Sequence, residues 1–329
     1  MERFDYGSFF GPIAPLADAL RESPERFWEP TREQLAQPHE YVLYLGCNVL
    51  RTMHLAESLV AVLKAMKVDF IALGGSAHCC GVIHQMVGDT AAGLRIGQKT
   101  LDTFGQCRPK VVLTYCPGCN TVFDGKLASG ELHCDLPYQH ITQFIAEHLD
   151  QLPSKKPIRR RVALHAHQST ARVQSDSAHV LAILRAIPAL DVIELPAGEE
   201  WGNICTPAIM KNIGAERDHA VVAAMFDAAK SAGCDAVVSV HHTCYRELLR
   251  AEKDFDLEWL NYIELLAASL ALGPFPPRYK QLFLAGDPEA AFVTLAPRAG
   301  ERGVNLDGLR RAVDVHFRPG ASSASIKRP

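Results

Sequence analysis

The sequence lacks several features that would place the protein in a familiar class. Its longest apolar run, near Leu265 to Leu272, is far shorter than the roughly 20 residues that a membrane span needs. The first residues show no basic region followed by an apolar stretch, the pattern of a secretion signal. A formal net charge of −3 argues against a broad nucleic-acid surface. We therefore expect a cytoplasmic protein with no membrane span and no nucleic-acid partner.

Common redox-cofactor motifs are missing as well. There is no ferredoxin-type Cys-x-x-Cys-x-x-Cys run, no Gly-x-Gly-x-x-Gly after a strand and no flavin fingerprint. The chain does contain 329 residues, 48% of them hydrophobic, which suits two globular domains. It also contains 10 cysteines. In a reducing compartment, clustered cysteines are more typical of metal ligands or catalytic groups than of structural disulfides.

Predicted strands and helices alternate along two stretches of the chain. In the first, strands are predicted where β-branched and aromatic residues concentrate, over 41–45, 68–73 and 110–115, with helices over 49–66 and from 82 to about 104. After a basic linker at about 150–161 the pattern restarts, with strands over 161–165, 191–195 and 235–240 and helices over 178–186 and 217–231. Such alternation predicts parallel sheets, which bind ligands beyond the carboxyl ends of their strands.

Five of the 10 cysteines share one feature, because each follows closely on a predicted strand of the first stretch. They are Cys47, Cys79, Cys80, Cys116 and Cys119. The first is separated from the adjacent pair by 31 residues, and the pair from the Cys-Pro-Gly-Cys segment by 35. Thiolates are the preferred ligands of iron–sulfur clusters and of structural zinc. The spacing therefore predicts one converging metal or iron–sulfur site at the sheet edge.

With Gly81 after the pair and Pro-Gly inside the last motif, this spacing resembles the cysteine-rich CCG domain of the heterodisulfide reductase B-subunit family. The resemblance covers residues of about 40 to 250. It implies an α/β fold of two pseudo-symmetric Rossmann-like CCG domains with small parallel sheets. It also implies that the five cysteines bind a noncubane [4Fe-4S] cluster, with Cys79 and Cys80 at its edge as candidate catalytic residues.

Two other interpretations of the first site remain open. Structural zinc uses four ligands, so a zinc site would leave one of the five cysteines without a role. A thioredoxin-type dithiol at Cys116 and Cys119 would leave three without a role. Cys107, Cys134 and Cys234 lie outside both motifs and are expected to be buried small hydrophobic residues.

An altered copy of the same motif lies downstream. Shifting the sequence by 125 positions places Cys205 on Cys80, His241 on Cys116 and Cys244 on Cys119, which indicates an internal duplication. Only two thiolates remain there, too few for the same five-thiolate cluster. With His165 or His167 as a fourth ligand, the set Cys205, His241 and Cys244 suits zinc or a Rieske-like [2Fe-2S] centre. A decayed site without metal is the alternative.

The resemblance predicts an iron–sulfur subunit that couples electron transfer to thiol, disulfide or sulfur-oxidation chemistry, closest to the B-type subunits of the complexes of sulfur-oxidising bacteria. Its partners would be a ferredoxin-like C-type subunit, a flavoprotein A-type subunit and a second B-type paralogue. His78 and His84 flank the cysteine pair and are candidate proton donors. Alternatives are an iron–sulfur subunit of a glycolate or lactate oxidase, a non-catalytic electron relay and a zinc-bound scaffold.

The expected domain organisation has four parts. Residues 1–39 form an N-terminal arm, 40–152 the first CCG domain, 153–273 the second with its Cys/His site, and 274–329 a C-terminal extension that ends in a disordered tip. The arm and the extension are expected to be docking segments.

Overall fold

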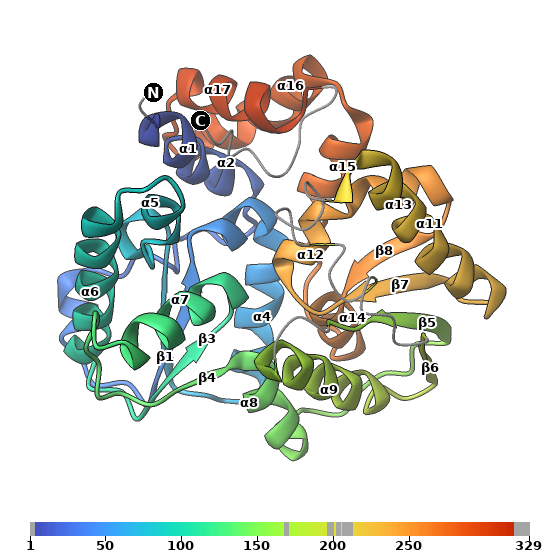
Figure 1. Cartoon of the computed structure of the whole chain (residues 1–329), viewed down its shortest axis with the longest axis horizontal. Helices are drawn as coiled ribbons and strands as arrows, with labels where there is room; N and C mark the ends of the chain where they lie inside the picture. The colour runs from blue at the N-terminus through green and yellow to red at the C-terminus, as the bar shows by residue number, and fades with distance from the viewer. Residues whose placement is uncertain (1–3, 168–170, 196–200, 202–204, 206–212, 319–329) are drawn as a thin grey trace. The chain divides into compact units, whose positions relative to one another are not determined.

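The computed structural model describes residues 4–167, 171–195, 201, 205 and 213–318 (Figure 1). The chain divides into two compact units. The first contains residues 1–57, 67–141 and 277–329, and the second contains residues 58–66 and 142–276. Each unit has one four-stranded sheet, and all pairings in both sheets are parallel. The predicted α/β class with two Rossmann-like sheets is therefore confirmed.

The first sheet has the strand order β2-β1-β3-β4. Its strands are β1 (Tyr41–Gly46), β2 (Phe70–Gly74), β3 (Val111–Thr114) and β4 (Tyr138–His140). Because β2 and β3 lie on opposite sides of β1, the chain changes direction across the sheet between β1 and β3. Ligands of open parallel sheets bind at this switch point, beyond the carboxyl ends of the strands.

Short loops and helices follow each strand of the first sheet. The elements are η1 (Asn48–Thr52), α4 (Met53–Ala65), η2 (Ser76–His78), α5 (Val82–Met86), α6 (Thr90–Gln106), α7 (Pro117–Ala128) and α8 (Ile141–Glu147). The core between sheet and helices holds Tyr44, Phe104 and Phe123 at centroid distances of 5.0 to 6.4 Å. Cys80, Cys116 and Cys119 belong to the same buried cluster. The cysteine site thus lies on a packed core, which restricts its side chains.

The two ends of the chain pack together within the first unit. Helices α1 (Tyr6–Phe10), α2 (Ile13–Leu20) and α3 (Arg32–Leu35) precede the sheet, and α15 (Arg278–Ala285), α16 (Pro288–Glu301) and α17 (Leu306–His316) follow the second unit. Both α16 and α17 contact α2, as the dark blue and red helices of Figure 1 show. The Arg298 side chain donates hydrogen bonds to the carbonyl oxygens of Ala19 and Arg21. The N-terminal arm and the C-terminal extension therefore pack against each other.

The second unit repeats the topology of the first. Its sheet has the order β6-β5-β7-β8, with β5 (Arg160–His165), β6 (Leu190–Glu194), β7 (Ala236–Ser239) and β8 (Glu258–Asn261). Its helices include α9 (Ala171–Arg185), α11 (Ala215–Ser231), α12 (His242–Glu247), α13 (Leu249–Phe255) and α14 (Tyr262–Ser269). The switch point falls between β5 and β7, as it falls between β1 and β3 in the first sheet. This equivalence supports the predicted duplication.

The fourth strand of each sheet was not predicted from the sequence. β4 has three residues and β8 has four, and each pairs along one side only, with β3 and β7 respectively. Strands this short produce no alternation of their own, so their conformation depends on the neighbouring strand. The predicted helix over 178–186 is wrong in its start, because α9 begins at Ala171. The predicted disordered tip lies mostly outside the described residues.

Candidate metal centres at the strand ends

The five cysteines of the first unit lie together at the carboxyl edge of its sheet. Cys47 directly follows β1, Cys116 precedes the first turn of α7 after β3, and the Cys79-Cys80 pair follows η2 beyond β2. All five are buried, with exposed fractions of at most 8%. Cys47 and Cys116 therefore flank the switch point, and the other three sulfurs close the site around it.

Hydrogen bonds among the thiols show that the five sulfur atoms form one group. Cys47 and Cys80 both donate to Cys79, and these bonds hold the pKa of Cys79 at about 3. The bond to Cys79, together with burial, raises the pKa of Cys47 well above its usual value. Contacts with Cys116 and Cys80, and then burial, raise the pKa of Cys119. Such a buried group of thiols is typical of a metal-binding site, where bound cations stabilise the thiolates.

Two glycines make room for the sulfurs. Gly46 has a φ of +71°, and a Cβ atom there would lie 3.1 Å from the Sγ atom of Cys119. Gly81 has a φ of +85°, and its N–H donates to the Sγ atom of Cys79 over 3.3 Å. Backbone N–H groups that point at sulfur stabilise cluster-bound thiolates. The residues present therefore fit an iron–sulfur cluster.

Two polar side chains support the same assignment. The Tyr44 hydroxyl donates to the backbone oxygen of His78 at 2.9 Å and lies 3.6 Å from the Sγ atom of Cys119. Asn120, in the first turn of α7 next to Cys119, is fully buried, and among the described residues its amide has no hydrogen-bond partner. A buried amide without a partner is costly unless another acceptor or donor is bound there. Cluster sulfides are acceptors of that kind.

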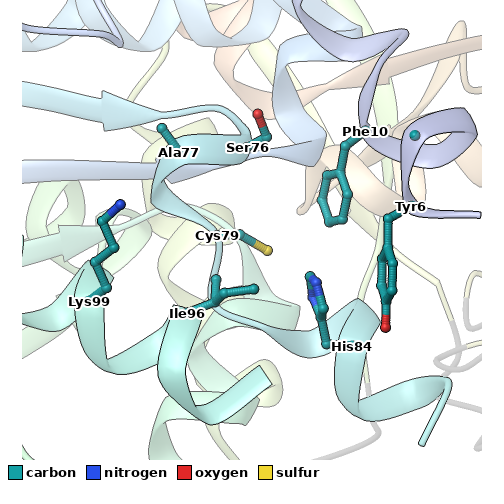
Figure 2. A pocket seen from close by; sticks show the side chains of 9 residues that line it. Tyr6, Phe10, Ser76, Ala77, Cys79, His84, Ile96 and Lys99 are labelled. Atoms are coloured by element: carbon teal, nitrogen blue, oxygen red, sulfur yellow. The ribbon is translucent and has the colours of Figure 1, made fainter. Parts of the chain in front are cut away.

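A cavity of about 390 Å³ lies next to the cysteine pair (Figure 2). Tyr6 and Phe10 from α1 line one side, His84 and Lys99 come from α5 and α6, and the Cys79 sulfur points into the space between them. The rings of Tyr6 and His84 stack at a centroid distance of 4.3 Å. The N-terminal arm thus forms a wall of the cavity, which its sequence did not predict.

The two histidines beside the pair have different positions. His84 lines the cavity and is 9% exposed, and its Nδ1 atom has no hydrogen-bond partner within the described part of the chain. His78 does not line the cavity, and burial lowers its pKa below the usual histidine value. Of the two, His84 is the one placed to exchange a proton with a bound molecule.

The second unit brings four of the predicted ligands together. They are His165, His167, Cys205 and Cys244, all buried, and one ligand atom of each lies within 4.8 Å of the others. His165 ends β5, His167 lies two residues further, and Cys244 is in the first turn of α12. The motif spacing predicted one of the two histidines of this segment as a ligand, and the structure brings both close to the sulfurs.

His241 lies beside this group, with a different partner. Its Nε2 atom is 2.9 Å from Oδ2 of Asp176, and its Nδ1 atom is 3.9 Å from the Sγ atom of Cys244. Burial alone would lower the pKa of His241, but the hydrogen bonds and charges of Asp176 and Cys244 together outweigh it and raise the pKa to about 9. Asp176, on α9, was missed in the sequence because its spacing from the motif residues carries no signal.

The two thiols of the second site are electrostatically distinct. Burial and the hydrogen bond to Cys244 raise the pKa of Cys205 well above its usual value. Burial acts in the same direction on Cys244, but the hydrogen bond from Cys205 and the neighbouring His167 and His165 outweigh it and lower its pKa. Cys244 is therefore the thiolate of the pair.

The first site lies within a segment that matches a known protein family. The pattern of the cysteine-rich domain family CCG matches residues 41–124, which include all five cysteines of that site. The match begins at the first residue of β1 and ends within α7, so the family pattern covers the strand ends that position the sulfurs.

Two curated sequences resemble parts of the chain. A probable membrane-anchored ferredoxin of Chromohalobacter salexigens is 26% identical over 163 residues, 47% of this chain and 24% of that protein. An uncharacterized iron–sulfur protein of Methanocaldococcus jannaschii is 24% identical over 242 residues, 68% of this chain and 45% of that protein. The chain therefore spans less than half the length of these relatives. Within the described residues, no helix is long and apolar enough to cross a membrane.

Solved structures share parts of the chain's arrangement at low identity. A hypothetical protein from Helicobacter pylori is 13% identical with a TM-score of 0.45, covering 79% of this chain and 57% of that one. An aspartate racemase homologue from Pyrococcus horikoshii OT3 is 14% identical with a TM-score of 0.35, covering 70% and 97%. Neither likeness bears on the function of this chain.

Proposed function

We propose that the chain is an iron–sulfur oxidoreductase subunit in which Cys47, Cys79, Cys80, Cys116 and Cys119 hold a noncubane [4Fe-4S] cluster. The observation that carries the proposal is the convergence of five buried thiols, linked one to the next by hydrogen bonds, at the switch point of a parallel sheet. A single tetrahedral zinc ion would use four of them. A cluster with several irons accommodates all five.

The named relatives support an iron–sulfur assignment. One is called a ferredoxin and the other an iron–sulfur protein, and the first matches the chain over 163 residues. Bound in the first unit, the cluster would supply one-electron transfer beside a sulfur-binding cavity. The chain's own residues shape that cavity and move protons within it.

We further propose that the cavity beside Cys79 admits a thiol, disulfide or other sulfur-bearing substrate. Tyr6 and Phe10 provide aromatic surface, the Lys99 ammonium suits an anionic group, and the His84 imidazole can donate or accept a proton. Reduction of a disulfide consumes two electrons and two protons and yields two thiols, and sulfur oxidation runs in the opposite direction. A ferredoxin-like subunit would deliver or accept the electrons.

The remaining partners follow from the same proposal. A flavoprotein of the A type and a second B-type paralogue would complete a heterodisulfide-reductase-like complex, as in sulfur-oxidising bacteria. The cavity favours an enzyme over a non-catalytic relay or a scaffold, because a relay needs no space for a substrate beside its cluster. A glycolate or lactate oxidase assembly is the alternative within the enzyme class.

Metal analysis of anaerobically purified protein tests the cluster. We expect about four irons with matching acid-labile sulfide per chain and an EPR signal. Cys80→Ser should reduce the iron content strongly. Cys134→Ser, a matched change at a thiol outside the site, should leave iron and sulfide unchanged. Zinc in place of iron, or equal iron in both variants, would exclude the proposed cluster.

A further inference from the structure

The four donors of the second unit point to a metal site of its own. We infer that His165, His167, Cys205 and Cys244 bind one zinc ion in a closed, structural site. The inference concerns residues outside the matched CCG segment and does not depend on the proposed cluster. A cysteine-and-histidine set of two each is among the common structural zinc sets.

The distances between the donors converge on one point. The Nε2 atom of His167 lies 2.7 Å from the Sγ atom of Cys244 and 2.9 Å from that of Cys205, and the two sulfurs are 3.2 Å apart. Around one tetrahedral zinc, two thiolate sulfurs stand about 3.8 Å apart, since each Zn–S bond is about 2.3 Å. An outward adjustment of well under 1 Å therefore suffices for all three donors.

The fourth donor is buried and hydrogen-bonds the thiol of Cys244. His165 is 1% exposed, and among the described residues its Nε2 atom has no hydrogen-bond partner. Its ring lies 5.3 Å from the ring of His167, measured between centroids. Buried polar atoms of native proteins almost always have a partner, and a metal ion would be one here.

The geometry favours one metal ion over a Rieske-type [2Fe-2S] centre. In a Rieske centre the two histidines bind one iron and the two cysteines bind the other, so imidazole and thiolate donors are separated by the width of the cluster. Here His167 contacts both sulfurs directly. A disulfide is also excluded, because its sulfurs would be about 2.05 Å apart.

His241 supports the site from outside the ligand set. Its Nε2 atom bonds Asp176 at 2.9 Å, and its other nitrogen approaches Cys244 at 3.9 Å. Ser177, next to Asp176 on α9, accepts a hydrogen bond from the backbone N–H of His167 at 2.9 Å. These contacts orient two of the ligands, so His241 and Asp176 are positioning residues.

All four protein donors fill the coordination sphere, and all are at most 6% exposed. A zinc site with four protein ligands has no open position for a substrate and contributes to folding. It would tie three segments of the second unit together, the end of β5, the residue Cys205 and the start of α12. The chain would then combine a redox-active first unit with a redox-inert second one.

The test is metal analysis of the whole chain and of single variants. Wild type should carry about one zinc ion per chain. Cys205→Ser and His165→Gln should each lose zinc and keep the iron of the first unit. Cys234 is a buried thiol of the same unit that lies outside the site. The control variant Cys234→Ser should keep both metals. Absence of zinc from wild type and from zinc-supplemented protein would overturn the inference.

The variant His241→Gln tests whether His241 is itself a zinc ligand, as the motif spacing predicted, or only a positioning residue. As a positioning residue, His241 should be replaceable with zinc retained at saturation and an affinity lowered by about 10- to 100-fold. Loss of zinc in this variant with retention in His165→Gln would overturn the inference. Where a variant fails to fold, cobalt-substituted wild type provides a second readout. Thiolate-to-cobalt charge transfer with tetrahedral d–d bands is expected, and an octahedral spectrum would contradict it.

Discussion

The N–H of Gly81 donates a hydrogen bond to the Sγ atom of Cys79 over 3.3 Å. Gly81 also has a φ of +85°, a backbone conformation that residues with a side chain rarely adopt. On the other side, a Cβ atom at this position would lie 2.1 Å from the backbone oxygen of Gly93. The residue after the cysteine pair is thus restricted from two directions.

Gly81→Ala should therefore disrupt the first site. The added methyl group must displace the backbone at Gly93, and alanine is also strained at a positive φ. We therefore expect several kcal/mol of destabilisation and loss of iron. Gly88→Ala is the matched control, because its φ is +88° and nothing lies within 4 Å of the added atom. The control should lose only about 1–2 kcal/mol and keep its iron. Thermal unfolding and iron analysis measure both, and equal losses would contradict the steric argument.

Tyr44→Phe tests the hydroxyl beside the sulfurs. Hydrogen bonds to cluster sulfurs raise the reduction potential, since they stabilise the more negative, reduced state. The Tyr44 hydroxyl has one hydrogen, which is shared between the His78 oxygen at 2.9 Å and the Sγ atom of Cys119 at 3.6 Å, so its removal should lower the potential of the first site only slightly. The lost bond to the His78 oxygen should cost about 1 kcal/mol of stability. An EPR-monitored redox titration checks the shift, and an unchanged potential would show that the hydroxyl serves packing only.

Glu57 makes the stability depend on pH. Burial raises its pKa above 4.5, although its carboxylate accepts hydrogen bonds from the backbone N–H groups of Glu22 and Ser23. The folded protein thus binds the proton more tightly than the unfolded chain. This contribution to stability is complete below pH 4.5 and is lost as the pH rises through the raised pKa.

Glu57→Gln keeps an acceptor oxygen and removes the titration. Relative to wild type, the variant should gain stability as the pH rises from about 4.5 towards neutrality. Chemical unfolding of both proteins at each pH measures the difference, and metal loss at low pH affects the two alike. A difference that stays constant over this range would contradict the assigned shift.

Arg298→Ala tests the contact between the two ends of the chain. The Arg298 guanidinium donates to the carbonyl oxygens of Ala19 and Arg21 and pairs with Glu22, and the residue is half-buried. Its loss removes the side-chain donor of the Ala19 oxygen, whereas the Arg21 oxygen keeps a hydrogen bond from Arg302, and it should cost about 1–3 kcal/mol. Arg310→Ala removes an ion pair with Glu289 and a cation–π contact with Phe292, neither of which joins the two ends of the chain, and should cost about 1 kcal/mol. Equal effects in thermal unfolding would show that the two ends do not stabilise each other.

Much of the first site follows from the sequence alone. Cys47, Cys79 and Cys116 each follow a segment with the β-branched and aromatic composition of a strand, and parallel strands bring their carboxyl ends to one edge. The spacing of the five cysteines relative to these strands can therefore be read from the sequence. The alternation of strands and helices likewise predicted two parallel sheets, although the short edge strands β4 and β8 carried no signal.

The tertiary structure decided what depends on contacts between distant segments. Tyr6 forms a wall of the cavity beside Cys79 because α1 packs near α5, and no pattern in the arm indicates that neighbour. Asp176 holds His241 beside the second site because α9 passes that strand end. Periodicity and spacing report the conformation of a segment, whereas the partner of a side chain is set by the packing of whole elements. The positions of cysteine and histidine thus came from the sequence, and the ligand set, its supporting residues and the cavity came from the fold.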